Sequence, residues 1–205
     1  MIKAIIFDMD GVLIDAKEWH YEALNQALGR YGFEINRQDH ENIYDGLPTQ
    51  KKLEMLSAAK GLPTHLHSEI NQLKQQFTME LIHERCAPYP QHVHALTTLK
   101  NMEYKLAVAS NSIRHTVEVM MQKSGLNHFL DAMFSASDVK NPKPHPEIYL
   151  TTIAKLELTP SECLVVEDNE KGIAAARAAG AHVLAVRDVH DVTFTAIMTR
   201  IQECK

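Results

Sequence analysis

Residues 2–11 have the sequence IKAIIFDMDG, an apolar run that passes directly into two aspartates and a glycine. A short apolar run bounded by turn residues predicts a buried strand, here one that ends at Asp8. Aspartate and glycine are common turn formers, so a tight turn is predicted over 8–11. In an open parallel sheet, ligands bind beyond the carboxyl ends of the strands. This strand would therefore deliver the carboxylates of Asp8 and Asp10 to such a position.

The stretch that follows, from about Asp15 to Arg85, shows helical periodicity and no strong strand. Helices are predicted over 16–31, 48–61 and 64–81. Because this stretch leaves the sheet just after its first strand, it is placed to cover a ligand bound at that edge. We therefore predict a small all-helical cap domain, inserted at 15–85.

From residue 86 onward, strands alternate with helices. The later strands are predicted at 104–109, 132–135, 163–167 and 183–186. Alternation of buried strands with helices is typical of a parallel sheet in an α/β fold. The predicted fold is thus α/β, with a Rossmann-like parallel-sheet core formed by 1–14 and 86–205.

The overall charge offers no attraction to polyanions. The 205 residues include 21 basic and 26 acidic side chains, for a net charge of −5, so we predict neither nucleic-acid nor membrane binding. No signal peptide and no apolar stretch of bilayer length is visible. Three widely separated cysteines indicate no disulfide framework, which favours a reducing cytoplasm. The oligomeric state stays open.

Polar residues that could support chemistry fall at strand ends or helix starts, in four clusters. These clusters are Asp8 with Asp10, the Ser-Asn-Ser segment at 110–112, Lys143, and Glu167 with Asp168. In a parallel sheet all four would lie along one edge. Carboxylates at neighbouring strand ends suit a hard cation such as Mg²⁺. A hydroxyl, an amide and an ammonium supply the donors that a phosphoryl group requires.

Each cluster has an ordinary structural explanation when it is taken alone. An Asp-x-Asp-Gly segment is usually a turn, and Ser110 with Asn111 could cap the helix that follows. Lys143 could be a surface lysine, and Glu167 with Asp168 a solvated loop. Four such clusters at equivalent ends of successive strands favour a functional site instead.

All four clusters lie in segments that resemble the ordered signatures of the haloacid-dehalogenase-like superfamily. The segments are 7–13 (FDMDGVL), 108–112 (VASNS), 143–149 (KPHPEIY) and 166–180 (VEDNEKGIAAARAAG). They occur in the family's order and span nearly the whole chain, which makes the resemblance specific. The helical insertion resembles the cap of a subgroup that contains sugar-phosphate phosphatases, phosphoglycolate phosphatases and β-phosphoglucomutases.

The resemblance implies a reaction through a covalent intermediate. Asp8 would attack phosphorus and form an aspartyl-phosphate. Asp10 would protonate the leaving oxygen and then draw a proton from the hydrolytic water. Lys143 would offset negative charge and keep Asp8 ionised, and Ser110 and Asn111 would orient the phosphoryl oxygens.

The resemblance also implies a Mg²⁺ site. The ion would be held by the Asp8 carboxylate, the Asp10 backbone carbonyl and Asp168, with Glu167 either a ligand through water or a neighbour. Asn169 follows this acidic pair, where the subgroup usually has serine. Since both side chains form hydrogen bonds, we expect little change.

In the predicted cap, residues 45–53 lie where this subgroup sets substrate specificity. β-Phosphoglucomutases have Ser-Arg where this chain has Pro48-Thr49. Lys51 or Lys52 could compensate, although a lysine lacks the bidentate geometry of arginine. Thr49 and Lys52 are therefore candidate substrate contacts, and hydrolysis is favoured over the mutase alternative.

The histidines of this chain have different expected roles. His20, next to Trp19, follows the first linker, a stretch that can face the site in this family, so His20 is a further candidate substrate contact. The pairs at 65 and 67 and at 92 and 94 could suggest a transition-metal site. On predicted helices, however, i, i+2 side chains diverge, so we expect solvated histidines.

Two other classes of protein remain as alternatives. A metal-free haloacid dehalogenase shares the fold and the nucleophile, but its chemistry needs neither Asp10 nor the full acidic pair. A non-catalytic binding module would lack the nucleophile, the base or the lysine, and this chain has all three. The sequence therefore predicts a Mg²⁺-dependent phosphatase for a small phosphorylated metabolite, with a sugar phosphate favoured and a phosphosugar mutase as the alternative.

Overall fold

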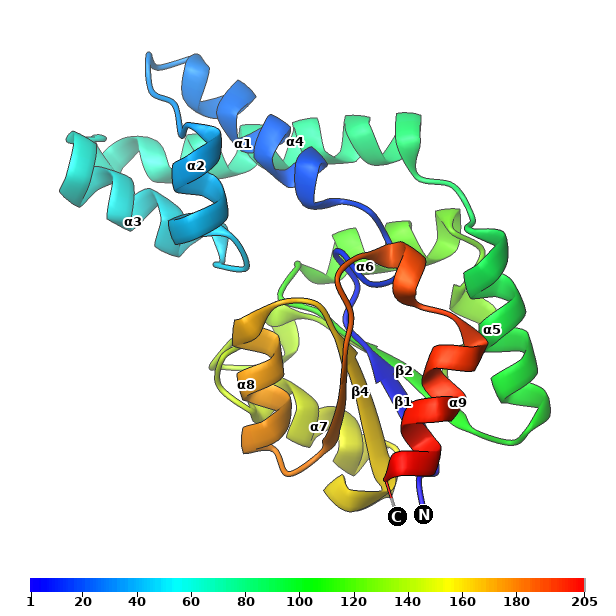
Figure 1. Ribbon diagram of the computed structural model, residues 1–205. Coiled ribbons are helices and arrows are strands. Elements are labelled where there is room, and N and C mark those ends of the chain that lie inside the picture. Colours follow the sequence, from blue (N-terminus) through cyan, green and yellow to red (C-terminus); the bar gives the residue numbers. More distant parts are fainter. Residues whose placement is uncertain (205) are drawn as a thin grey trace. The chain divides into compact units, whose positions relative to one another are not determined.

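The computed structural model describes residues 1–204, which form two compact units (Figure 1). One unit contains Met1–Asp15 together with the chain from Cys86 onward, and the other contains Ala16–Arg85. We refer to them as the core unit and the helical unit. Within the described residues, no helix combines the length and the apolar character that crossing a membrane requires.

The core unit is built on a five-stranded sheet in which all neighbouring strands are parallel. The strands are β1 (Ala4–Phe7), β2 (Lys105–Ala109), β3 (Ala132–Phe134), β4 (Cys163–Glu167) and β5 (His182–Ala185). Their order is β3-β2-β1-β4-β5, so β1 is central and pairs with β2 on one side and β4 on the other. The predicted parallel α/β fold is confirmed.

Helices cover both faces of this sheet. The helices of the core unit are α5 (Pro90–Asn101), α6 (Arg114–Lys123), α7 (Glu147–Lys155), α8 (Glu170–Ala178) and α9 (Phe194–Glu203). Helices α7 and α8 pack on the face that includes Ala4 and Ile6, whereas α5 and α9 pack together on the opposite face (Figure 1). Successive β1 residues point to opposite faces, and all four are fully buried. This is why the first strand is apolar at every position rather than at alternate ones.

The helical unit contains no strand among its residues, Ala16–Arg85. Its elements are α1 (Lys17–Gly29), α2 (Arg37–Asp39), the π-helical turn η1 (His40–Tyr44), α3 (Thr49–Lys60), the short η2 (Thr64–Leu66) and α4 (His67–Arg85). Helices α1 and α4 pack along each other and share an apolar core with α3. The three predicted helices are confirmed, and Gly61, with φ of 72°, ends α3.

The expectation of solvated histidines is wrong for one member of each pair. His65 and His94 are exposed, but His67 and His92 are buried. Residues two apart on a helix point about 200° away from each other, so one ring of each pair turns into the core. There His67 Nε2 lies 2.7 Å from a serine hydroxyl, and His92 Nε2 lies 2.8 Å from a backbone carbonyl. Burial lowers the pKa of His92, which favours its neutral form.

Candidate active site

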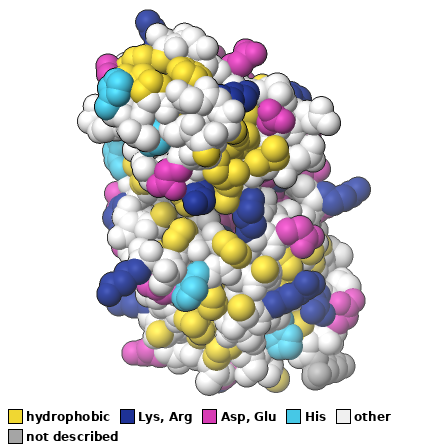
Figure 2. Space-filling model, turned by 90° about the vertical axis from the view of Figure 1, so that its left-hand side faces the viewer, with side chains coloured by type: hydrophobic (Ala, Val, Ile, Leu, Met, Phe, Trp, Pro, Cys, Tyr) yellow, Lys and Arg dark blue, Asp and Glu magenta, His cyan; other side chains and the backbone are white. Residues whose placement is uncertain are grey.

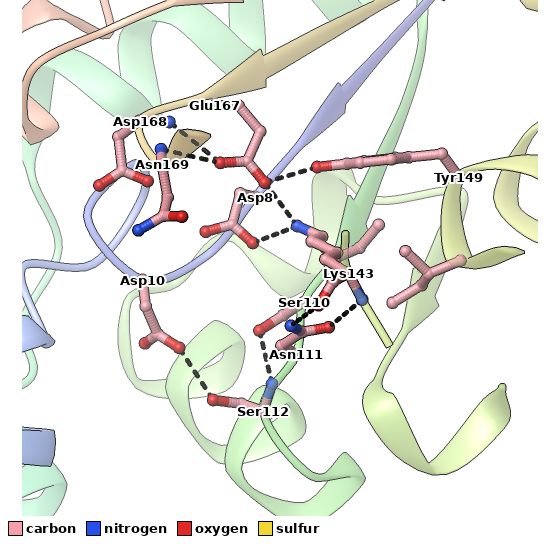
Figure 3. A network of polar contacts seen from close by, with 12 residues as sticks. Asp8, Asp10, Ser110, Asn111, Ser112, Lys143, Tyr149, Glu167, Asp168 and Asn169 are labelled. Atoms are coloured by element: carbon pink, nitrogen blue, oxygen red, sulfur yellow. Dashed lines mark hydrogen bonds and ion pairs between the residues drawn. The ribbon is translucent and has the colours of Figure 1, made fainter. Parts of the chain in front are cut away.

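Asp8 lies at the carboxyl end of β1, at the centre of the sheet (Figure 3). Its backbone N–H donates to the Val166 carbonyl (2.9 Å), which extends the pairing of β1 with β4 up to this residue. The chain runs from β1 outward through β2 to β3 and then crosses to β4 on the other side of β1. Such a reversal of strand order is where open α/β sheets place their ligands. The topology therefore points to Asp8 as the centre of a site.

The turn after Asp8 places Asp10 at the same edge. Gly11 has φ of 88°, a conformation that side chains disfavour, and its N–H donates to the Ile14 carbonyl (2.7 Å). The Ser112 hydroxyl, from the loop after β2, donates to Asp10 Oδ2 (2.8 Å). The predicted tight turn is confirmed, and the Asp10 carboxylate is oriented by a residue 102 positions away.

Lys143 is buried at the centre of the polar network. Its ammonium donates to Asp8 Oδ1 (2.6 Å), to Glu167 Oε1 (2.7 Å) and to the Ala109 carbonyl (2.8 Å). A lysine ammonium has three N–H groups, so these contacts use all of them. The explanation of Lys143 as a surface lysine is therefore wrong: the ammonium joins the ends of β1, β2 and β4.

Glu167, the last residue of β4, is almost completely buried. Besides Lys143, its Oε1 accepts a hydrogen bond from the Tyr149 hydroxyl (2.7 Å). Its Oε2 accepts from the backbone N–H groups of Asp168 (3.1 Å) and Asn169 (3.2 Å). Four donors thus hold this carboxylate in one place, and the solvated-loop explanation is wrong for Glu167.

A glycine in α8 makes room for the Glu167 side chain. A Cβ atom at Gly172 would lie 1.7 Å from Glu167 Oε1 and 2.5 Å from Oε2, which is far inside van der Waals contact. Just before the helix, the Asn169 side chain caps α8 by accepting from the Lys171 N–H (3.0 Å). Serine could cap the helix in the same way, which explains why asparagine is tolerated here.

The charges of this network oppose one another across short distances. Burial raises the pKa of Asp8 well above its ordinary value; the Lys143 ammonium acts in the opposite direction, and the carboxylates of Glu167 and Asp168 add to the rise. For Lys143, burial alone would lower the pKa, but Asp8 and Glu167 outweigh it and raise the pKa. Lys143 thus stays charged. Additional positive charge near Asp8 would favour the ionised form of the Asp8 carboxyl group.

Burial also raises the pKa of Tyr149 well above its ordinary value, and the nearby Glu167 carboxylate adds to this rise. The Tyr149 hydroxyl therefore remains protonated and acts as a donor to Glu167.

The acidic residues at this edge suit a hard cation. One carboxylate oxygen from each of Asp8, Glu167 and Asp168 lies within 4.8 Å of the others. Oxygen donors of this kind are the ligands that Mg²⁺ prefers. Because the two Glu167 oxygens already accept four hydrogen bonds, the geometry favours Asp8 and Asp168 as ligands and Glu167 as their neighbour.

The structure brings both sequence-predicted phosphate-binding residues to the same edge. Ser110 is buried, and its Oγ accepts from the Ser112 N–H (3.0 Å). The Asn111 side chain bonds to the backbone of Lys143, with Oδ1 accepting from its N–H (3.0 Å) and Nδ2 donating to its carbonyl (3.3 Å). Asn111 therefore fixes the loop from which Lys143 projects. The helix cap considered for this segment is not formed, since Ile113 is the N-cap of α6.

The helical unit contains the remaining candidates. Thr49 is half-buried as the first residue of α3. Lys52, one turn later, is 7% exposed, whereas Lys51 is exposed and lies 3.6 Å from Glu54. Burial lowers the pKa of His40, and the ammonium of Lys52 lowers it further. The structure thus distinguishes the two lysines that the sequence treats alike.

His20 forms a contact that sequence reasoning missed. Its Nδ1 lies 3.2 Å from the ammonium of Lys74, which is 9% exposed. Trp19, beside it, is half-buried. Lys74 is four residues after Ile70 and three before Phe77, so it occupies the apolar stripe of α4. A lysine at a position of the apolar stripe was the sequence signal that could have indicated a buried polar contact here.

The structure thus places a buried aspartate, held by a lysine and flanked by further carboxylates, at the switch point of a parallel sheet, where α/β proteins bind their ligands. A family model described as haloacid dehalogenase-like hydrolase matches residues 5–186. The chain belongs to this family, as its four signatures predicted.

Relatives with assigned names extend this finding. A phosphorylated carbohydrates phosphatase from Thermotoga maritima is 31% identical over 182 residues, 87% of this chain and 82% of that protein. The fructose-1-phosphate phosphatase YqaB of Escherichia coli is 29% identical over 185 residues, 89% of this chain and 95% of that protein. A solved β-phosphoglucomutase from Clostridium difficile shares the fold, with a TM-score of 0.86 at 24% identity, covering 99% of this chain and 98% of that one. The chain is an enzyme of the phosphoric monoester hydrolase class, within the phosphatase and phosphomutase type of this family.

Proposed function

We propose that this protein is a Mg²⁺-dependent phosphatase that hydrolyses a small sugar phosphate through an aspartyl-phosphate on Asp8. The observation that supports it best is the buried contact between the Lys143 ammonium and Asp8 Oδ1, at 2.6 Å, beside further carboxylates. A carboxylate that is to attack an anionic phosphoryl group needs such compensating charge.

The reaction proceeds in two displacements. Asp8 attacks phosphorus, an O–P bond forms, and the sugar oxygen leaves with a proton from Asp10. Asp10, now a carboxylate, takes a proton from water, and the resulting hydroxide attacks the aspartyl-phosphate and restores Asp8. The hydrogen bond from Ser112 holds Asp10 at the same edge as Asp8.

The Asp8 and Asp168 carboxylates, which lie close together, would hold Mg²⁺. The Asp10 backbone carbonyl would be a third oxygen ligand. The bound ion supplies positive charge that offsets the charge of the phosphoryl group. Glu167 acts as the neighbour that keeps Lys143 in place. Ser110 and Asn111 orient the phosphoryl oxygens.

The proposed substrate class is supported by two relatives, which are named for phosphorylated carbohydrates and for fructose 1-phosphate. The helical unit acts as the cap, with Thr49, Lys52 and His20 as its substrate contacts. The observation that supports the alternative, a phosphosugar mutase, is the sequence similarity to a β-phosphoglucomutase. The Pro48-Thr49 pair, in place of Ser-Arg, favours hydrolysis.

We expect phosphate release from sugar monophosphates in the presence of Mg²⁺, and loss of that release in excess EDTA. The reason is that the charge of Asp8 and its neighbours is offset in part by the metal. The measurement is phosphate release over a panel of phosphorylated metabolites, with restoration by added Mg²⁺ as the control. Activity unchanged in EDTA would contradict the metal site. Formation of glucose 6-phosphate from β-glucose 1-phosphate, faster than phosphate release, would establish the mutase alternative.

We expect Lys52→Met to raise KM for the preferred sugar phosphate about tenfold, because a buried ammonium that donates a hydrogen bond to a sugar hydroxyl contributes on the order of 1.4 kcal/mol. Hydrolysis of p-nitrophenyl phosphate, which lacks the sugar, should change less than twofold. Lys51→Met is the matched control, since Lys51 is exposed and has no role in this proposal. Equal effects of the two substitutions on KM would count against Lys52 as a substrate contact.

A further inference from the structure

Tyr149 is a fully buried residue of α7 to which the proposed reaction assigns no role. Its side chain belongs to the apolar core that α7 and α8 share with one face of the sheet. Its hydroxyl donates to Glu167 Oε1 at 2.7 Å, and the Lys143 ammonium lies 4.7 Å from the centre of its ring (Figure 3). The same side chain thus contacts both members of the buried ion pair.

Packing explains the ring but not the hydroxyl. The neighbouring buried positions of α7 include Ile148 and Ile153, and a phenylalanine would fill the same volume as Tyr149. A buried hydroxyl needs a partner, and this one has a carboxylate that already accepts from Lys143. The hydroxyl therefore takes part in the charge network.

We propose that Tyr149 is a positioning residue, which acts through Glu167 to keep the Lys143 ammonium in contact with Asp8. This inference rests on the proposed function for its kinetic consequence and on the observed contacts for its geometry. Tyr149 itself touches neither the reacting phosphoryl group nor the sugar.

The mechanism is a competition between two carboxylates for one ammonium. Lys143 lies 2.6 Å from Asp8 Oδ1 and 2.7 Å from Glu167 Oε1, so small displacements change which carboxylate it neutralises. With the Tyr149 hydroxyl in place, Glu167 Oε1 accepts one of its two side-chain hydrogen bonds from a neutral donor. Without it, Lys143 is the remaining side-chain donor to that oxygen, and the charge-assisted bond draws the ammonium toward Glu167 and away from Asp8.

The kinetic test compares Tyr149→Phe with Thr152→Val. The first substitution removes the hydroxyl and keeps the ring. The second removes another buried hydroxyl of α7, one that donates to the Ile148 carbonyl (2.7 Å), so it serves as the matched control. With p-nitrophenyl phosphate and Mg²⁺, Tyr149→Phe should lower kcat about tenfold and change KM less than twofold. Equal kcat values for the two variants would overturn the inference.

A double-mutant cycle separates positioning from a general loss of folded enzyme. If Tyr149 acts through Glu167, its substitution has no further effect once Glu167→Gln has removed the competing charge. The double variant Tyr149→Phe/Glu167→Gln should then have the same kcat as Glu167→Gln alone. A further tenfold loss in the double variant would overturn the inference.

An activity-independent measurement keeps this inference distinct from the proposed function. In protein labelled with ¹⁵N-lysine, the ammonium signal of Lys143 is assigned by its absence in Lys143→Met. Its hydrogen exchange should be at least several times faster in Tyr149→Phe than in the wild type or Thr152→Val, since the ammonium moves away from Asp8 and the N–H group that Asp8 accepts in the wild type loses its partner. An unchanged exchange rate would overturn the inference even if the enzyme is a phosphatase. Faster exchange in Tyr149→Phe, together with a wild-type protein that hydrolyses no phosphate ester, would leave Tyr149 as a positioning residue and refute the proposed function.

Discussion

Asp8→Asn should reduce Mg²⁺-dependent phosphate release by about 10⁴-fold or more, the scale seen when a covalent nucleophile is removed. Asparagine has nearly the same shape as aspartate, so the variant should fold. Its amide lacks the negative charge and cannot form the acyl-phosphate that turnover requires. The amide oxygen of asparagine can still accept from Lys143, which also keeps the Ala109 carbonyl and Glu167 as acceptors. The measurement is the steady-state rate of phosphate release at saturating substrate.

Asp15→Asn is the matched control for this substitution. Asp15 is an exposed carboxylate of the same unit, seven positions further along the chain. The rate of phosphate release by Asp15→Asn should stay within twofold of the wild-type rate. If Asp8→Asn kept the wild-type rate while remaining folded, the covalent mechanism would be wrong, whatever the fate of the metal site.

Gly172→Ala should lower phosphate release at least a hundredfold and destabilise the protein by about 3 kcal/mol, the cost of disrupting a buried ion pair. The new methyl group would occupy the position of the Glu167 carboxylate, 1.7 Å from Oε1. The end of a flexible side chain can usually move away from a new methyl group. Here four hydrogen bonds and complete burial hold the carboxylate, so its displacement breaks the contacts with Lys143 and Tyr149.

Gly29→Ala is the control for placing alanine at a helical glycine. Gly29 is the last residue of α1, has no positive φ, and a Cβ there would have no atom within 4 Å. We expect this variant to be as stable as the wild type or up to about 1 kcal/mol more stable, with unchanged activity. Thermal or urea unfolding measures both variants. A Gly172→Ala protein with wild-type stability and rate would show that Glu167 is not held as the network indicates.

Outside the candidate active site, basic and acidic side chains are interspersed over the face of the molecule that Figure 2 shows. Together with the net charge of −5, this leaves the site's own charged groups to bind an anionic substrate. The local contacts of Lys143, rather than the overall field, therefore support the proposed chemistry.

Much of the fold could be predicted because its signals are local. The apolar run of β1, the alternation after residue 86 and the helix stop at Gly61 each depend on residues close together in the chain. The missed elements have weaker signals of this kind. Helix α9 (Phe194–Glu203) was not predicted, although Thr193 caps it by accepting from the Ala196 N–H (3.1 Å). The segment that precedes α9 contains only short strand and turn patterns, which give little indication of where a helix begins.

The site contacts that sequence reasoning missed join residues that are far apart in the chain. Tyr149 bonds to a residue 18 positions away and Ser112 to one 102 positions away. Nothing next to either residue indicates that partner. The burial of His92 likewise depends on a carbonyl 97 positions further along the chain. Local periodicity places such a side chain on a helix face but does not show what lies opposite.

From the sequence alone, the parallel α/β core and the four chemical clusters at strand ends follow, because strand ends are local features and parallel strands bring them to one edge. Only the tertiary structure decided which members of those clusters meet. It assigns the Lys143 ammonium to both Asp8, 135 positions away, and Glu167, and it directs the Asn111 side chain to the Lys143 backbone. Those pairings depend on strand order, register and side-chain direction, which arise from packing of the whole core unit.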